Sequence, residues 1–87
     1  KGNKMTPLKY LDISTTHVKR ETMNPVSLHH LIAEYEYGAF FYVPDELDDE
    51  CPPDLAAVLR FAKDNDCTLV RLDSDGGTFA ELETYDW

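Results

Sequence analysis

The stretch that decides the fold runs from Pro52 to Lys63, PPDLAAVLRFAK. Its two prolines end the preceding loop and suit the first turn of a helix, where a proline gives up no hydrogen bond. Apolar side chains then recur with the i, i+3, i+4, i+7 spacing of one buried helix face, at Leu55, Val58, Leu59 and Ala62. The sequence therefore predicts an amphipathic helix that needs a sheet to cover its apolar side.

Strands are expected on both sides of this helix along the chain. Leu8–Ser14, LKYLDIS, alternates apolar and polar residues, and Tyr37–Val43, YGAFFYV, is a nearly continuous apolar and aromatic run. Cys67–Asp73, CTLVRLD, predicts a further strand. The glycines of Ser74–Gly77 indicate a turn, and a last strand is expected from about Thr78 to Leu82.

A second helix is expected between the first two strands. Asn24-Pro25 is typical of a helix start, and Val18–Met23 before it is expected to form a short turn. Apolar residues follow at helical spacing, at Leu28, Leu31, Ile32 and Tyr35. The expected order is β-α-β-α-β-β, and two helices on one side of a three- or four-stranded sheet would bury both apolar surfaces. The predicted fold class is therefore α+β, with two layers.

The length of 87 residues suits one hydrophobic core, and 43% hydrophobic residues favour a folded domain over a disordered acidic tail. Residues 5–87 are interpreted as a single domain, and Lys1–Lys4 before Met5 as a tag remnant or a disordered N-terminus. No apolar run approaches the length of a membrane span, about 18 residues, and the N-terminus lacks the apolar stretch of a signal peptide. We therefore expect a soluble cytoplasmic monomer.

Charge is distributed unevenly along the chain. Residues 1–33 carry five basic and two acidic side chains, whereas residues 34–87 carry three basic and fifteen acidic ones, within a total of −9. Such a field repels nucleic acid and anionic membranes, and it attracts a basic partner. The alternative is a solvated acidic surface that only keeps the protein soluble.

Catalytic and metal-binding patterns are weak in this sequence. Asp73–Gly76, DSDG, resembles part of a calcium loop without the remaining spacing, so a polar hairpin turn is expected there. No triad pattern accompanies the three histidines, which are expected at the surface or its boundary: His17, His29 and His30. We therefore expect no enzyme activity, no cofactor and no metal.

Cys51 and Cys67 lack the spacing of zinc ligands, and structural thiols are the expected role. A disulfide between them stays open, although a cytoplasmic setting disfavours it. Among the aromatic residues, strand alternation places Phe40 and Tyr42 on one face and Phe41 on the other. Core packing on both faces is the favoured interpretation, and partner binding through an open aromatic face is the alternative. The terminal Trp87 is expected to dock on the sheet.

Four segments together suggest a family: LDISTTHV (11–18), YGAFFYVPDE (37–46), PPDLAAVLRFAKDNDC (52–67) and ETYDW (83–87). They resemble a group of small proteins of unknown function carried by bacterial phages, plasmids and integrated elements. In size and acidity the chain is similar to phage anti-CRISPR proteins, in particular to an inhibitor of the type I-C system. This resemblance implies a partner, the basic DNA-binding surface of a CRISPR effector, such as the large Cas8-type subunit that reads the protospacer-adjacent motif. It transfers no motif residue to this chain.

The densest acidic stretch, Val43–Asp54, VPDELDDECPPD, suits such a partner because it holds six carboxylates and no Lys or Arg. On a ten-residue loop that spans at most roughly 33 Å, they average about one per 5.5 Å, within a factor of two of the roughly 3.4 Å between phosphates of one DNA strand. All these side chains are expected to be exposed, because burying an unpaired carboxylate is unfavourable. The predicted partner-binding site consists of Glu34, Glu36, Asp45, Glu46, Asp48, Asp49, Glu50, Asp54, Asp73 and Asp75.

Together with the acidic stretch, this resemblance implies a DNA-mimicking inhibitor that blocks target-DNA recognition by a type I Cascade effector. The alternatives are an acidic protein that masks another basic partner, either a restriction nuclease or the toxin of a toxin–antitoxin pair.

Overall fold

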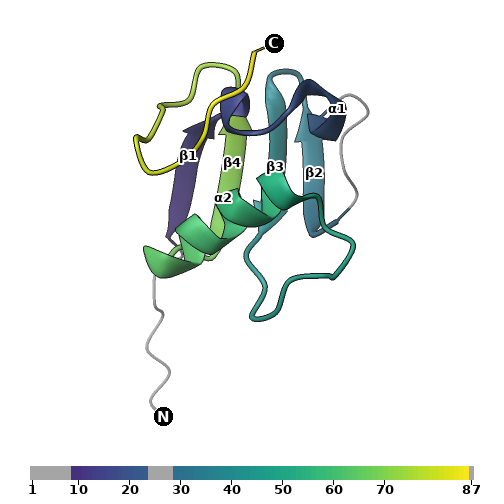
Figure 1. The fold of residues 1–87 in the computed structure, drawn as a ribbon. Helices are drawn as coiled ribbons and strands as arrows, with labels where there is room; N and C mark the ends of the chain where they lie inside the picture. The colour runs from purple at the N-terminus through teal and green to yellow at the C-terminus, as the bar shows by residue number, and fades with distance from the viewer. Residues whose placement is uncertain (1–8, 24–28, 87) are drawn as a thin grey trace.

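A four-stranded mixed sheet with the strand order β1-β4-β3-β2 is the frame of the molecule in the computed structural model, which describes residues 9–23 and 29–86 (Figure 1). Its strands are β1 (Tyr10–Ser14), β2 (Leu31–Tyr35), β3 (Gly38–Tyr42) and β4 (Leu69–Asp73). β1 runs parallel to β4, whereas the pairs β2–β3 and β3–β4 are antiparallel. The expectations for Lys1–Lys4, for a helix start at Asn24-Pro25 and for Trp87 lie outside the described residues.

Helix α2 (Pro53–Asp64) lies across one face of this sheet (Figure 1). All four apolar positions expected to face the sheet are at most 1% exposed, which confirms the predicted register: Leu55, Val58, Leu59 and Ala62. The helix ends where Asp66 adopts a φ of 63°, the left-handed conformation common just after helices. Among the described residues, no helix has both the length and the apolar character needed to cross a membrane.

The core lies between α2 and the sheet. Side chains from three strands are fully buried on the helix side of the sheet: Ile13, Ala39, Phe41, Val70 and Leu72. Full burial of a large apolar side chain contributes about 1.5–3 kcal/mol relative to exposure, so this layer supplies much of the stability. The predicted α+β class is therefore confirmed, with a four-stranded sheet and two helices.

The order of elements differs from the prediction at β2. Leu31–Tyr35 was expected to complete a helix, but it pairs with β3 through a hairpin whose connection is only Glu36-Tyr37. The Tyr35 and Phe40 rings stack across the two strands with centroids 5.3 Å apart. Such cross-strand packing outweighs the small differences in helix propensity, so the helical spacing was misleading. The second helix, α1 (Arg20–Met23), is a single turn within the segment expected to form a turn.

The strand expected at Thr78–Leu82 is also absent from the described chain. An isolated parallel bridge pairs Gly77 with Ile13, and residues 78–86 then form no further strand. The physical reason is that β1 ends at Ser14 and the 3-10 helix η1 (Thr15–His17) follows it. Residues 78–82 therefore have no extended strand beside them with which to pair. The residues 77–86, the C-terminal segment, instead attach to η1, where the Tyr85 N–H donates to the Thr16 carbonyl at 2.8 Å.

Candidate functional site

The acidic loop (residues 43–52) joins β3 to α2 at one end of the sheet (Figure 1). Five of its carboxylates are exposed as expected: Asp45, Glu46, Asp48, Asp49 and Glu50. Within residues 9–23 and 29–86, Asp48 is the loop residue with a salt bridge, to His29 at 2.8 Å from Nδ1 to Oδ2. The loop therefore presents a concentrated negative charge, and Asp48 is its one carboxylate with an ion-pair partner in the described part of the chain.

Asp48 organises the acidic loop through its backbone and its side chain. Its carbonyl accepts from the Cys51 N–H at 3.0 Å, and its Oδ1 accepts from the Glu50 N–H at 3.0 Å. Its own N–H donates to Nε2 of His30 at 3.2 Å. The Glu50 N–H, followed by His29, lowers the pKa of the Asp48 carboxyl below its ordinary value. The carboxylate that shapes the loop therefore remains ionised at neutral pH.

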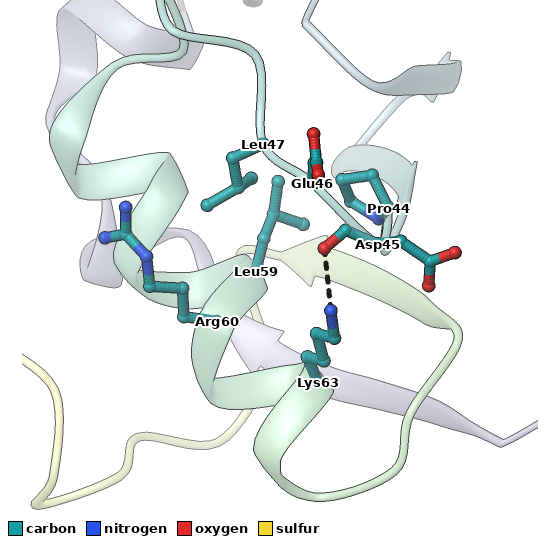
Figure 2. A pocket seen from close by; sticks show the side chains of 7 residues that line it. All are labelled: Pro44, Asp45, Glu46, Leu47, Leu59, Arg60 and Lys63. Carbon is teal, nitrogen blue, oxygen red and sulfur yellow. Dashed lines mark hydrogen bonds between the residues drawn. The ribbon is translucent and has the colours of Figure 1, made fainter.

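A side chain of helix α2 holds the start of the acidic loop in place. The Lys63 ammonium donates to the Asp45 carbonyl oxygen at 2.7 Å, which leaves the Asp45 carboxylate pointing away from the helix (Figure 2). Between loop and helix lies a hollow of about 360 Å³, and Leu47 and Leu59 are part of its lining. The charged side chains thus lie on a loop that Lys63 holds near its start and Asp48 holds near its centre.

Asp54 is not part of this exposed surface, which corrects the prediction. It is 7% exposed, and its Oδ2 accepts from the Lys19 N–H and from the Thr22 hydroxyl, both at 2.7 Å. The physical reason is that the carboxylate lies in the first turn of α2 and satisfies donors of the chain around α1. Its role is therefore to join α1 to α2.

Asp73 is also buried, at 5% exposure, contrary to the prediction. Its Oδ2 accepts from the Tyr35 hydroxyl and from Nη2 of Arg71 at 3.0 Å, and its Oδ1 accepts from the Asp75 N–H at 2.7 Å. The Tyr35 hydroxyl, followed by the Asp75 N–H, lowers the pKa of Asp73. The same cluster raises the pKa of Arg71, chiefly through Tyr35, while burial raises that of Tyr35. These hydrogen bonds offset the free-energy cost of burying the carboxylate.

The remaining predicted site residues, Glu34, Glu36 and Asp75, are exposed but lie apart from the acidic loop. They belong to the far end of β2, to the β2–β3 connection and to the turn after β4, at the opposite end of the sheet (Figure 1). Five-residue strands separate the two ends by about 16 Å. The ten predicted acids therefore form an exposed group of five, a distant exposed group of three and two buried single residues.

His17 is buried at 2% exposure, whereas a surface or boundary position was expected. Its Nε2 accepts from the Phe79 N–H at 2.9 Å, so Nδ1 carries the proton and donates to the Glu83 carbonyl at 2.7 Å. The attachment of the C-terminal segment explains this burial. Both ring nitrogens are therefore occupied in a structural role, which leaves neither free to act as a base.

Sequence reasoning missed the contribution of His29 and His30 to the acidic loop. The helix expected here would direct these neighbouring side chains apart, but both contact Asp48. The adjacent histidines were the only signal, because their partner is about twenty positions away.

Cys51 and Cys67 are buried free thiols, and burial raises the pKa of Cys51. In the described part of the chain, no three His, Cys, Asp or Glu side chains gather closely enough to hold a metal ion. The DSDG segment forms a polar turn, closed by the Gly76 N–H on the Asp73 carbonyl at 2.9 Å. It is not the expected hairpin turn, because no strand follows it in residues 74–86.

Comparison with curated proteins and with solved structures found no match. A family model does match, and its description is "Family of unknown function (DUF5983) C-terminal domain". It covers residues 10–87, from the first residue of β1 through the C-terminal segment. The chain therefore belongs to the DUF5983 C-terminal domain family, whose function is unknown.

Proposed function

We propose that this protein is a non-enzymatic inhibitor that binds the basic DNA-binding surface of another protein and so excludes DNA. The observation that carries the proposal is the acidic loop, in which five exposed carboxylates stand on consecutive or nearly consecutive residues, Asp45 to Glu50. A surface that binds phosphates through Lys and Arg attracts such a loop by the same electrostatic force.

The fixed conformation of the acidic loop supports this function. A mobile acidic segment would lose conformational entropy on binding, whereas the contacts of Asp48 with Glu50 and His29 already order these charges. The Lys63 contact with the Asp45 carbonyl orders the start of the loop in the same way. The loop therefore resembles a preorganised polyanion more than a flexible acidic tail.

The sequence resemblance supplies the first partner to test, a type I-C Cascade effector and its subunit that reads the protospacer-adjacent motif. A restriction nuclease and a basic toxin are the other partners that the same charge would suit. An immobilised sample of the protein should retain the correct partner from a panel of purified candidates, and the retained partner should then fail to shift a labelled DNA duplex.

The decisive variant combines Asp48→Lys, Asp49→Lys and Glu50→Lys, which reverses the charge at the centre of the acidic loop. We expect this variant to lose inhibition of DNA binding, because attraction to a basic cleft becomes repulsion. A matched control combines Glu34→Lys, Glu36→Lys and Asp75→Lys, with the same charge change at the opposite end of the sheet. The control should keep most of the inhibition.

Circular dichroism establishes whether both triple variants remain folded. A folded loop variant that still inhibits would overturn the proposed mechanism. Equal losses in the two variants would mean that net charge, and not the acidic loop, determines binding. Unimpaired DNA binding by a partner saturated with the wild-type protein would contradict exclusion of DNA itself.

A further inference from the structure

The face of the sheet opposite α2, the open face, is aromatic. Phe40 and Tyr42 lie on it, because the residues that alternate with them in β3 are buried under the helix. Strand pairing places Tyr10 beside Leu69 and so in line with Tyr42, and the Tyr35 ring packs on Phe40. The Tyr37 ring adjoins that of Tyr35, with centroids 6.5 Å apart. Four of the five tyrosines of the chain therefore lie on this face or beside it.

Three of these rings are available to a partner. Tyr10, Tyr37 and Tyr42 keep 52%, 54% and 46% of their surface exposed. Strand register places Leu69 between Tyr10 and Tyr42, so these two rings flank one apolar strip. Exposed apolar groups that cluster on one face mark interaction sites more than single ones do, and Tyr is enriched at protein interfaces.

The open face already holds one guanidinium group on a ring. Cζ of Arg71 lies 5.6 Å from the Tyr35 ring centre, and its Nε donates to the Tyr35 hydroxyl at 2.9 Å. Asp73 at 3.0 Å and Asp12 at 3.9 Å balance the charge of Arg71. This arrangement orders the Tyr35 side chain and leaves no unbalanced positive charge there to repel a basic ligand.

Two properties decide which occupant fits. Four strands of five residues cover roughly 300 Å², well below the roughly 800 Å² per partner of a stable dimer, so an extended segment suits the face better than a second copy. The net charge of −9 and the exposed carboxylates at both ends of the sheet repel the phosphates of nucleic acid. Tyrosine rings in a negative field attract cations, and a planar guanidinium stacks on them better than an ammonium.

We propose that the open face binds an extended, arginine-bearing segment of a basic protein, with guanidinium groups stacked on Tyr10 and Tyr42. This inference rests on the proposed function for the basic character of the partner. The acidic loop attracts the partner through its charge, and the open face adds a preference for arginine over lysine. The second aromatic strip, Tyr37 with Tyr35, extends the same surface toward the β2–β3 connection.

The probes are two capped peptides of equal length and charge, Gly-Arg-Gly-Arg-Gly-Arg-Gly and its lysine counterpart. Titration followed by NMR at about 150 mM salt, where long-range attraction is screened, reports both the affinity and the residues contacted. We expect the arginine peptide to shift the ring signals of Tyr10 and Tyr42. It should also bind about two- to fivefold more tightly than the lysine peptide, because roughly one stacked guanidinium changes the affinity by that factor.

Matched variants separate the rings from the general charge. Tyr10→Ala with Tyr42→Ala should abolish the preference for arginine, whereas Tyr10→Phe with Tyr42→Phe should retain it because the rings remain. Equal affinity for both peptides, shifts confined to residues 45–50, or an unchanged preference in the alanine variant would overturn the proposal. Stronger shifts of the same rings by a single-stranded oligothymidine would overturn it in favour of nucleic acid.

The experiments can distinguish failure of this inference from failure of the proposed function. The triple reversal Asp48→Lys, Asp49→Lys, Glu50→Lys should abolish DNA exclusion but leave the preference for the arginine peptide in place. Preference for arginine without any DNA exclusion by the wild-type protein would refute the proposed function alone. DNA exclusion without that preference would refute only the role of the open face.

Discussion

The carboxylates of the acidic loop and those of Asp54 and Asp73 are chemically alike but have different surroundings. The loop carboxylates face solvent, and most of them have no hydrogen-bond donor among the described residues. Asp54 and Asp73 are buried, and each accepts hydrogen bonds from several donors, at least one of them from a distant part of the chain. Acidic residues close in the sequence can therefore serve folding or binding, and the number of donors around each distinguishes the two roles.

The strongest test of this difference is Asp54→Ala. The Lys19 N–H and the Thr22 hydroxyl would lose their shared acceptor, and each buried unpaired donor costs about 1–3 kcal/mol. We expect the free energy of unfolding, measured with urea, to fall by about 2 to 4 kcal/mol. Asp49→Ala is the matched control in the acidic loop. A loss no larger than that of the control would contradict a structural role for Asp54.

Acid should distinguish Asp73 from its exposed neighbours. Its pKa is lower in the folded protein than the unfolded value of about 3.9, so its stabilising effect is complete above that value and disappears as the pH falls through the folded pKa. We expect the melting temperature of the wild type to fall more steeply between about pH 5 and pH 2 than that of Asp73→Asn. Parallel curves for the two proteins would remove Asp73 from the acid-sensitive groups.

Added salt should raise the melting temperature through the acidic loop, whereas acid should lower it. Screening relieves repulsion among exposed carboxylates, so the melting temperature should rise by about 2 to 4 °C between low and moderate NaCl. The triple reversal of Asp48, Asp49 and Glu50 to lysine should reduce this rise. The affinity for a basic partner should fall over the same salt range. A melting temperature that falls steadily with salt would show that attractive ion pairs outweigh repulsion in the folded protein.

A single substitution in the acidic loop should have the smallest effect. Asp49→Asn removes one exposed charge without breaking a hydrogen bond of the described chain. We expect the free energy of unfolding to change by no more than about 0.5 kcal/mol. Partner affinity should fall less than about fivefold, because exposed charge pairs contribute little individually. A large loss of binding would identify Asp49 as a specific contact instead of one member of a diffuse charge.

Local sequence patterns predicted the elements that depend on local burial. The apolar spacing in α2 gave its buried face correctly, and the apolar run of residues 37–43 gave β3. At β2 two patterns competed, since Leu28, Leu31, Ile32 and Tyr35 fit a helix while the short Glu36-Tyr37 connection fits a hairpin. Pairing with β3 decided the outcome, and such pairing is not visible in a single window of sequence.

The candidate site was predictable only in part for a similar reason. Exposure of the acidic loop follows from its composition, because unpaired carboxylates avoid the core. Burial of Asp54 depends on Thr22, which is 32 positions away, and no local pattern connects them. Asp73 did have a local signal, because Arg71 two residues earlier points to the same face of the strand. The aromatic character of the open face was foreseeable from Phe40 and Tyr42, but its full extent required the strand order.

The position of β4 has a consequence for how the protein is made. β4 is the last strand in the sequence but lies between β1 and β3, and the Thr68 N–H closes onto the Lys9 carbonyl, 59 positions earlier. During synthesis β1 therefore remains unpaired until residues 69–73 have left the ribosome. Until then the apolar face around Phe41 also remains uncovered on one side. Closing so long a stretch of chain is slow compared with forming a hairpin. A stalled or truncated nascent chain would display this uncovered strand to other chains, and unpaired strand edges of this kind promote aggregation.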